Sequence, residues 1–460
     1  MTIKGTKEQE EIWNEMKNGN GHMMVYAGAG TGKTFTIVEG AKYVEGKKGF
    51  LAFNKSIATE LGKKLPLDCE AMTFHSLGLA SIKMSNRSAK VDTKKNYNII
   101  KDVLGKEFKS APALNKLISL LKSSMADWED EEQIHSIINQ YDIEFDGLSD
   151  ERAAIAALPL IRKICMDITL VDFDDMIWLP VVLELPVKHY DVVFVDEAQD
   201  FNEVQRRLIL KACNGGRMIV VGDPKQAIYG FRGADSASMD IFHQELSKSS
   251  RGVDKFTLSI TWRCPQSVVK EANRFFTDYS AREDAEEGVV ETNAAFLPSA
   301  GDLVLCRVNA PLVSECFSLI SEGKAAYVLG REIGYSLEVL IKKVTKDKEV
   351  EIEEFLSVLN DYYRKRMMVL ERADKEYQMQ TLTDNIKEIF GEKGKKSGVV
   401  FSTVHKAKGL EAENVWILQP EKMPHPMAKT DSAREQEKNL CYVAITRAMK
   451  TLRYVGARIG

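Results

Sequence analysis

The stretch Ala27-Gly28-Ala29-Gly30-Thr31-Gly32-Lys33-Thr34 decides how the N-terminal part of this 460-residue sequence folds. It follows the apolar run His22-Met23-Met24-Val25-Tyr26, which predicts a short buried strand, and it precedes a segment that predicts a helix. This order is that of a P-loop, in which glycines let backbone N–H groups converge on phosphate oxygens at a helix N-terminus. We expect Lys33 to reach the β- and γ-phosphates of a nucleotide and Thr34 to bind Mg²⁺. A glycine-rich turn that binds no nucleotide is the alternative.

Two acidic residues follow a second apolar run. Tyr190 to Val195 predicts a strand, and Asp196 and Glu197 come directly after it. Ligands of parallel α/β sheets bind at the carboxyl ends of the strands. We expect Asp196 to hold Mg²⁺ and Glu197 to orient and deprotonate an attacking water. For an isolated Asp-Glu pair an exposed acidic turn would be the alternative, and the P-loop upstream weighs against it.

A third apolar run, Met218 to Val221, leads into a loop that ends near Asp235. Gln226 in this loop is a candidate sensor of the γ-phosphate. The aromatic and arginine residues just beyond it are candidates for stacking on nucleic-acid bases. One loop would then contact both the nucleotide and the nucleic acid, so that the presence of the γ-phosphate could alter the affinity for the bases.

Composition narrows the class of protein. A net charge of −4 with 44% hydrophobic and 28% charged residues is typical of a soluble globular chain of two to four domains, and any grip on nucleic acid must come from a local groove. The seven cysteines show no CxxC pair, which argues against zinc and iron–sulfur sites and favours packed thiols. No apolar stretch is long enough to span a membrane and no signal core begins the chain, so we expect a cytoplasmic protein.

Further motifs follow one another along the chain. They are Thr6-Lys7-Glu8-Gln9, Phe50-Leu51-Ala52-Phe53-Asn54-Lys55, Thr73-Phe74-His75-Ser76, Asp172-Phe173-Asp174-Asp175, Trp262-Arg263, Thr403-Val404-His405-Lys406-Ala407-Lys408-Gly409-Leu410-Glu411 and Tyr442-Val443-Ala444-Ile445-Thr446-Arg447-Ala448. With these motifs the sequence resembles UvrD/Rep/PcrA-type superfamily 1A DNA helicases over almost its whole length. The compact layout is similar to phage and F-box DNA helicases. We expect the protein to act in the cytoplasm of a bacterial or phage-infected cell.

The resemblance implies an α/β fold of two RecA-like P-loop motor lobes with parallel sheets, each interrupted by a mainly helical insert. The first lobe would comprise 1–78 and 183–252, with a helical insert at 79–182. The second would comprise 253–330 and 397–460, with a short helical insert at 331–396. Apolar residues at helical spacing, such as Leu114, Leu117 and Leu121, predict core-facing helices in the first insert.

The resemblance also implies ATP and Mg²⁺ as cofactors and assigns site residues. Arg263 and Arg447 would act as arginine fingers on the γ-phosphate, while Trp262 would stack on adenine and Phe35 stands where many relatives carry arginine. The residues expected to bind nucleotide are Gln9, Ala27, Gly28, Ala29, Gly30, Thr31, Gly32, Lys33, Thr34, Phe35, Trp262, Arg263, Glu411 and Arg447. Those expected to be catalytic are Lys33, Glu197, Gln226, Arg263 and Arg447, and those expected to hold metal are Thr34 and Asp196.

The implied partner is single-stranded DNA and its junctions with duplex. The residues expected to bind it are Asn54, Thr73, Phe74, His75, Tyr229, Phe231, Arg232, Thr403, His405 and Lys406. The implied activity is ATP-driven movement along the strand, 3′ to 5′, coupled to strand separation by a monomer. A translocase that removes bound proteins or recombinase filaments is the alternative, whereas a P-loop kinase or GTPase would not explain the motifs at 403–411 and 442–448.

Overall fold

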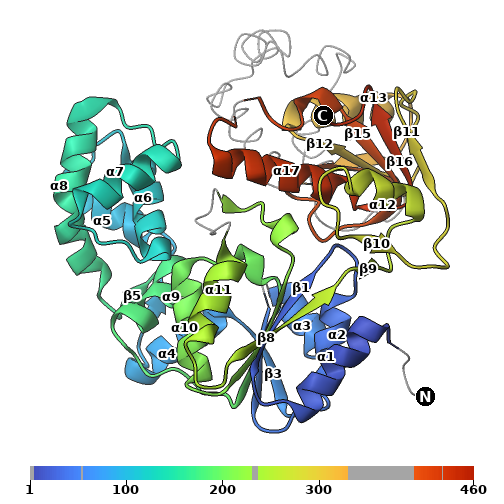
Figure 1. Ribbon diagram of the computed structural model, residues 1–460. Helices are drawn as coiled ribbons and strands as arrows, with labels where there is room; N and C mark the ends of the chain where they lie inside the picture. The colour runs from blue at the N-terminus through green and yellow to red at the C-terminus, as the bar shows by residue number, and fades with distance from the viewer. Residues whose placement is uncertain (1–4, 53–54, 231–236, 330–397, 427) are drawn as a thin grey trace, which may run out of the picture. The chain divides into compact units, whose positions relative to one another are not determined.

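The computed structural model describes residues 5–52, 55–230, 237–329, 398–426 and 428–460. These residues form two compact units, whose chain segments can be followed by colour in Figure 1. The first unit combines Met1–Ala27 with Gly32–Leu258, and the second combines Gly28–Thr31 with Ser259–Gly460. The tip of the glycine-rich stretch is thus grouped with the second unit.

The first unit is built on a six-stranded sheet in the order β3-β2-β6-β7-β1-β8, in which all neighbouring strands are parallel. The strands are β1 (His22–Ala27), β2 (Lys48–Ala52), β3 (Cys69–Thr73), β6 (Val192–Val195), β7 (Arg217–Gly222) and β8 (Val253–Leu258). The central strands are continuous apolar runs because a parallel sheet is covered on both faces. The three strands predicted from apolar runs are confirmed as β1, β6 and β7.

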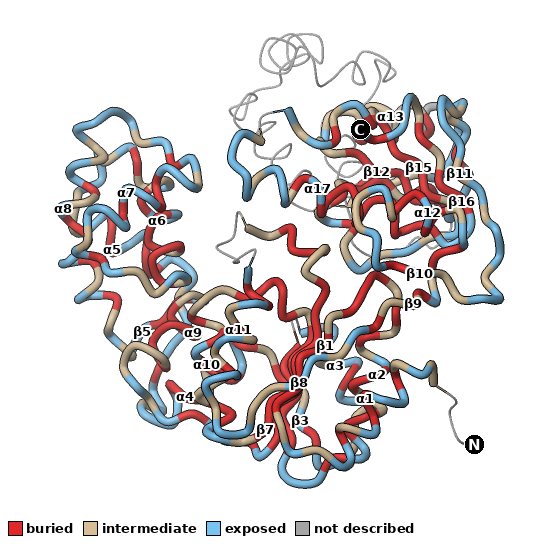
Figure 2. The backbone as a smooth tube through the Cα atoms, viewed as in Figure 1, coloured by how far each residue is buried: buried red, intermediate tan, exposed pale blue. Residues whose placement is uncertain are grey.

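Helices cover both faces of this sheet. On one face α1 (Lys7–Asn18), α2 (Lys33–Gly40) and α3 (Lys55–Leu61) share a buried cluster with the sheet residues Phe50 and Phe194. On the other face α4 (Phe74–Ser85), α9 (Phe173–Val182), α10 (Glu203–Cys213) and α11 (Ser238–Ser247) pack against Met24 and Val193. Figure 2 shows the strands as buried segments within this layered arrangement.

The region between α4 and α9 is helical, as predicted. It contains α5 (Lys95–Leu104), α6 (Ala111–Ser124), α7 (Glu131–Gln140) and α8 (Gly147–Cys165), together with a two-stranded sheet of β4 (Lys90–Val91) and β5 (Leu170–Val171). Leu114, Leu117 and Leu121 are buried on one side of α6, which confirms the predicted core face. Their cluster is continuous with the core beneath α4 and α9, so this region and the sheet belong to one unit.

The second unit has its own six-stranded parallel sheet, in the order β11-β16-β15-β12-β14-β13. Its strands are β11 (Val289–Glu291), β12 (Leu303–Cys306), β13 (Ala326–Val328), β14 (Val399–Thr403), β15 (Ala412–Leu418) and β16 (Ala448–Val455). The helices are α12 (Gln266–Ala272), α13 (Asn309–Ser321) and α17 (Asp431–Ile445), and a small sheet pairs β9 (Ile260–Thr261) with β10 (Ser280–Ala281). The expectation of two α/β lobes with parallel sheets is therefore confirmed.

One predicted boundary is wrong. The second lobe was expected to begin at residue 253, but Val253–Leu258 forms β8 and pairs with β1 along its whole length. β8 is the edge strand of the first sheet, where polar residues on the strand are tolerated. The first unit therefore extends to Leu258. The short helical insert expected at 331–396 lies outside the described residues.

All seven cysteine side chains lie in the described part of the chain and are buried as thiols, which confirms the prediction of packed cysteines. Within the same residues, no helix combines the length and apolar character needed to cross a bilayer.

Candidate nucleotide and DNA sites

The glycine-rich stretch bends the chain from β1 into α2. Ala27 ends β1, and Gly30 and Gly32 have φ angles of +68° and +83°, values that favour glycine. Gly32 caps α2, which begins with Lys33 and Thr34. Two of the predicted functional side chains therefore lie in the first turn of a helix, where backbone N–H groups and the helix dipole favour an anion.

The acidic residues after β6 meet this turn, because β6 and β1 end at the same edge of the parallel sheet with only β7 between them. The Thr34 hydroxyl donates a hydrogen bond of 2.7 Å to Asp196 Oδ2, and Lys33 Nζ lies 3.9 Å from Glu197 Oε1. Burial, and then the charge of Glu197, raise the pKa of Asp196 to about 6. This carboxylate would therefore be stabilised by an additional positive charge.

Glu197 has an unusual backbone conformation. Its φ of +54° places a non-glycine residue in the left-handed region, at a cost of about 1–3 kcal/mol. Gln199 Nε2 donates a hydrogen bond of 2.5 Å to Glu197 Oε2 and so fixes the carboxylate. Strain of this kind persists where the surrounding structure over-determines the backbone, as it does at many functional sites.

Gln226 joins the same polar network through residues that sequence reasoning missed. Gln226 Nε2 donates to Asp223 Oδ2 at 2.6 Å, and the backbone N–H of Asp223 donates to Gln199 Oε1 at 2.9 Å. Asp223 is buried, and burial raises its pKa. The signal for Asp223 was present in the sequence, since it follows the apolar run of β7 just as Asp196 follows β6.

Within the second unit, two tyrosines hold the tip of the glycine-rich stretch. Tyr279 Oη donates to the carbonyl oxygen of Ala29 at 2.7 Å, and the N–H of Ala29 donates to Tyr442 Oη at 3.0 Å. The N–H of Trp262 donates to the carbonyl oxygen of Gly30 at 2.8 Å. The backbone of this tip is thus fixed by side chains and backbone from three separate segments.

The predicted arginine fingers also lie in the second unit. Arg263 Nε donates to Glu411 Oε2 at 2.6 Å, which brings together two residues predicted to bind nucleotide. Arg447 is buried, and its guanidinium donates to the carbonyl oxygens of Val443 (2.9 Å) and Leu410 (3.1 Å). Burial, and then the charge of Arg263, lower the pKa of Arg447 to about 10. Arg447 would have to exchange carbonyl contacts to reach a phosphate.

The residues expected near the adenine base differ in accessibility. Gln9 is buried, with its amide nitrogen donating to Thr36 Oγ1 at 3.0 Å and its amide oxygen accepting from the N–H of Thr6. Phe35 is exposed in the first unit. Trp262 is exposed in the second unit, where the Arg282 guanidinium lies over its ring at 4.8 Å.

One residue predicted to contact DNA, Phe74, has a buried side chain. Phe74 is 2% exposed and packs edge-on against Phe201 with ring centroids 4.8 Å apart, because this side of α4 faces the core. Its neighbour His75 is exposed and lies edge-on to Phe173, with centroids 5.8 Å apart. Phe173 is 54% exposed and had not been singled out as a DNA contact. An exposed aromatic at the first position of a helix carries no distinct sequence signal.

The other predicted DNA contacts are distributed over both units. Thr73 caps α4, and Tyr229 is half-buried after β7. In the second unit Thr403 ends β14, and His405 and Lys406 follow it, with Lys406 exposed. Three further predicted contacts lie outside the described residues: Asn54, Phe231 and Arg232.

Comparison with known proteins identifies the family. The UvrD/REP helicase N-terminal domain matches residues 7–247, and the UvrD-like helicase C-terminal domain matches residues 317–456. F-box DNA helicase protein 1 of Schizosaccharomyces pombe is 25% identical over 97% of this chain and 57% of its own length. F-box DNA helicase 1 of Gallus gallus is 24% identical over 98% of this chain and 49% of its own length.

A bacterial relative covers less of the chain. ATP-dependent DNA helicase PcrA of Bacillus subtilis is 24% identical over 58% of this chain and 39% of its own length. The chain spans about half the length of the first two of these curated relatives. Because the N-terminal domain of the family alone matches more than half of the residues, this chain belongs to the UvrD/REP helicase family.

Proposed function

We propose that this chain is an ATP-dependent DNA helicase that moves along single-stranded DNA in the 3′ to 5′ direction and couples hydrolysis to strand separation. The observation that carries the proposal is the hydrogen bond of 2.7 Å between Thr34 and Asp196, beside the contact of Lys33 with Glu197. Together these residues provide a cation for phosphate, oxygen ligands for a divalent metal ion and a base for water.

The residues present fit Mg²⁺. Thr34 and Asp196 present a hydroxyl and a carboxylate, which are the hard oxygen ligands that Mg²⁺ prefers. The raised pKa of Asp196 is the expected mark of a buried carboxylate that a cation would stabilise. Bound Mg²⁺ would neutralise charge that develops on the phosphate oxygens during transfer.

The remaining groups have distinct roles in hydrolysis. Glu197 would orient the attacking water and take its proton, with Gln199 holding the carboxylate in place. Gln226 would report the presence of the γ-phosphate through its bond to Asp223. Arginine fingers are worth roughly 10³–10⁵ in rate in other phosphoryl-transfer enzymes, and we assign this role to Arg263 and Arg447 in the second unit.

The DNA-binding surface includes the exposed pair His75 and Phe173 in the first unit. A base that stacks on an aromatic side chain gains about 1–3 kcal/mol, and the gain is tolerant of sequence. His405 and Lys406, which follow β14 in the second unit, add a polar and a positively charged contact. A grip that depends on stacking and local charge is compatible with the net charge of −4.

The first test measures ATP hydrolysis with and without single-stranded oligonucleotide, followed by unwinding of duplexes that carry a 3′ or a 5′ single-stranded tail. We expect hydrolysis to rise with oligonucleotide and unwinding to require ATP and the 3′ tail. A hydrolysis rate that does not respond to oligonucleotide would refute the proposal. Unwinding from the 5′ tail alone would refute the direction.

Matched variants test the DNA surface separately. Phe173→Ala and His75→Ala should each raise the Kd for oligonucleotide roughly fivefold or more, because a stacking surface is lost. Tyr97→Ala serves as the control, since Tyr97 is an equally exposed aromatic (55%) in α5 of the same unit. Equal effects at all three positions would show that binding does not depend on the His75 and Phe173 pair.

A second candidate is a translocase that strips bound proteins or recombinase filaments from DNA and unwinds little. The short insert predicted at 331–396 favours it, because a smaller insert offers less surface at a duplex junction. Parallel assays of strand displacement and of protein displacement would separate the two functions. Either activity would suit a monomer that acts in DNA replication, repair or recombination.

A further inference from the structure

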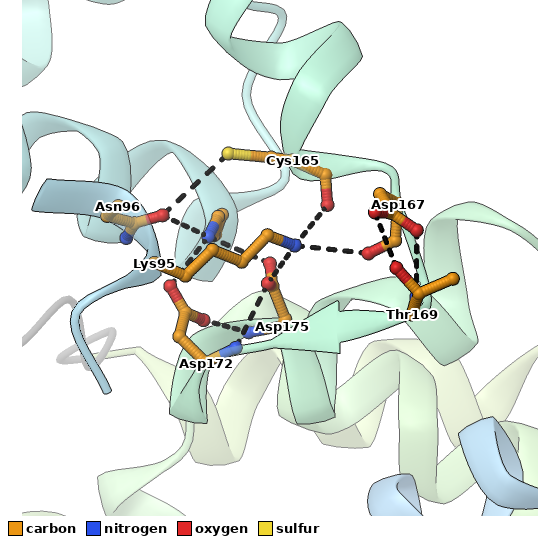
Figure 3. Close-up of polar contacts among 8 residues, drawn as sticks. Lys95, Asn96, Cys165, Asp167, Thr169, Asp172 and Asp175 are labelled. Atoms are coloured by element: carbon orange, nitrogen blue, oxygen red, sulfur yellow. Dashed lines mark hydrogen bonds and ion pairs between the residues drawn. The ribbon is translucent and has the colours of Figure 1, made fainter. Parts of the chain in front are cut away.

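Two buried lysines meet two carboxylates where the helices of the inserted region approach α9. Lys95 is 3% exposed and directs its ammonium toward three oxygen atoms (Figure 3). These are Asp175 Oδ2 at 2.6 Å and the carbonyl oxygens of Cys165 at 2.9 Å and Asp167 at 3.1 Å. An ammonium has three N–H donors, so these contacts use the full capacity of Lys95.

Lys122 in α6 completes the cluster. It is 1% exposed, and its ammonium lies 3.0 Å from Asn96 Oδ1, 3.2 Å from Asp172 Oδ2 and 2.8 Å from Asp175 Oδ1. Burial lowers the pKa of Lys122, but the carboxylates of Asp175 and Asp172 outweigh burial and raise it above its ordinary value. Lys122 is therefore charged. Two ammonium groups meet the two hydrogen-bonded carboxylates of Asp172 and Asp175, and a third carboxylate, Asp174, lies near enough to interact with Lys122 and Asp175.

The same carboxylates shape the first turn of α9. Asp172 Oδ1 accepts from the N–H of Asp175 at 2.7 Å, and Asp175 Oδ2 accepts from the N–H of Asp172 at 3.1 Å, which is a reciprocal capping box. Phe173 is the first residue of the helix and lies between them in the sequence. Its exposed ring lies edge-on to His75, and its position therefore depends on the two carboxylates that form ion pairs with the lysines.

We propose that Lys95 and Lys122 are positioning residues for the DNA-binding pair His75 and Phe173. By balancing Asp172 and Asp175 they fix the first turn of α9, and with it the ring on which a base would stack. The inference rests on the proposed DNA-binding role of this pair. The helices of the inserted region would then increase the affinity for DNA without contacting DNA themselves.

The test is a double-mutant cycle on the charge balance. Lys122→Met leaves two carboxylates facing one ammonium, and removal of one partner of a buried pair leaves an uncompensated charge. We expect the Kd for a fluorescent single-stranded oligonucleotide to rise about tenfold, as for the loss of one base stack. This increase should exceed any change in the KM for ATP.

The second variant restores the balance without restoring the lysine. In Lys122→Met with Asp172→Asn, Lys95 faces Asp175 alone, and asparagine remains a good helix cap. The Kd should return to within about threefold of the wild-type value. Asp172→Asn alone keeps an amide oxygen that can accept from Lys122, so it should raise the Kd for oligonucleotide less than Lys122→Met does. If Lys122→Met does not fold, the comparison of Asp172→Asn with the double variant still measures the effect of Lys122.

A matched control separates positioning from general damage. Lys48 is also 3% exposed in the same unit, where it bonds to the carbonyl oxygen of Val44 at 2.7 Å and to Asp68 at 2.6 Å. Lys48→Met should lower the thermal midpoint without a selective rise in the Kd for oligonucleotide. A selective rise in this control, or a double variant that binds as poorly as Lys122→Met, would overturn the inference.

The oligonucleotide affinities of Phe173→Ala and Lys122→Met separate the positioning role of the lysines from the proposed DNA contact on which it rests. If Phe173→Ala binds oligonucleotide as tightly as the wild type, the proposed DNA contact fails. If Phe173→Ala weakens binding but Lys122→Met does not, the DNA contact stands and the positioning role of the lysines fails.

Discussion

Substitution of Asp196 by asparagine should make the nucleotide-free protein more stable while abolishing turnover. The folded structure raises the pKa of Asp196 from its ordinary 3.8 to about 6, through burial and the neighbouring charge of Glu197. A tenfold difference in proton affinity corresponds to about 1.4 kcal/mol. The ionised carboxylate therefore costs the folded state up to about 3 kcal/mol at pH 7.5, and asparagine would remove this cost.

Part of the gain is offset by hydrogen bonding. Asp196 accepts one bond from the Thr34 hydroxyl and another from the N–H of Glu197 at 2.9 Å, on different oxygens. An asparagine has one oxygen, so one of these bonds is lost, at about 1 kcal/mol. We therefore expect a net increase of about 1–2 kcal/mol in the free energy of unfolding at pH 7.5.

The gain should depend on pH with a definite sign. Because the pKa is higher in the folded than in the unfolded state, the wild-type protein takes up a proton on Asp196 and gains stability as pH falls through 6 toward 4. The advantage of Asp196→Asn is then full above pH 7 and at most about half as large at pH 5. Urea unfolding at both pH values, without nucleotide, measures this difference.

A second aspartate provides the control. Asp302 is buried in the second unit and accepts hydrogen bonds from Trp416 Nε1 at 2.8 Å and Asn414 Nδ2 at 3.0 Å. Asp302→Asn should lower stability at both pH values, since its acceptor oxygens are in use. The reasoning is refuted if Asp196→Asn is less stable than the wild type at pH 7.5, or if its advantage does not shrink at pH 5.

Three other substitutions have defined outcomes. Lys33→Ala should lower kcat for ATP hydrolysis by at least about 10²-fold, because a positive charge that stabilises the transition state is lost. The Kd for oligonucleotide in a fluorescence titration should change less than about twofold. A large loss of oligonucleotide binding would contradict the role assigned to Lys33. Tyr442→Phe should raise the KM for ATP about fivefold, because the N–H of Ala29 loses its acceptor in a buried place. Tyr454→Phe removes another buried hydroxyl of the second unit and should leave that KM unchanged; equal effects would show that Tyr442 has no special relation to the glycine-rich tip. Gly78→Ala would place a Cβ 1.8 Å from the carbonyl oxygen of Met176, so it should lower the free energy of unfolding in urea by about 3 kcal/mol. A decrease below about 1 kcal/mol would show that α4 and α9 can move apart to accept the methyl group.

The sequence predicted the central strands because each is an apolar run that ends in a glycine-rich or acidic turn. β8 was assigned to the wrong lobe because Asp254 and Lys255 interrupt its apolar pattern, as is common in a strand at the edge of a sheet. Phe74 and His75 show the same limit for the DNA surface. They are adjacent in one motif, but only the three-dimensional packing decides that the first faces the core and the second faces solvent.

The buried lysines had no signal in the sequence. Lysines in amphipathic helices are almost always exposed, so Lys95 and Lys122 would be assigned to the solvated faces of α5 and α6. Their burial depends on carboxylates that lie at least 50 residues away in the chain, Asp172 and Asp175. A long-range balance of charge of this kind becomes visible only when the helices are placed side by side.

The left-handed backbone at Glu197 has a consequence for protein engineering. Glycine or asparagine would adopt this conformation at lower cost, so either substitution should raise heat resistance while removing the group expected to activate water. A library selected for survival at high temperature alone would therefore accumulate inactive members at this position. Any thermostable form intended for use on DNA needs a screen that scores turnover alongside melting.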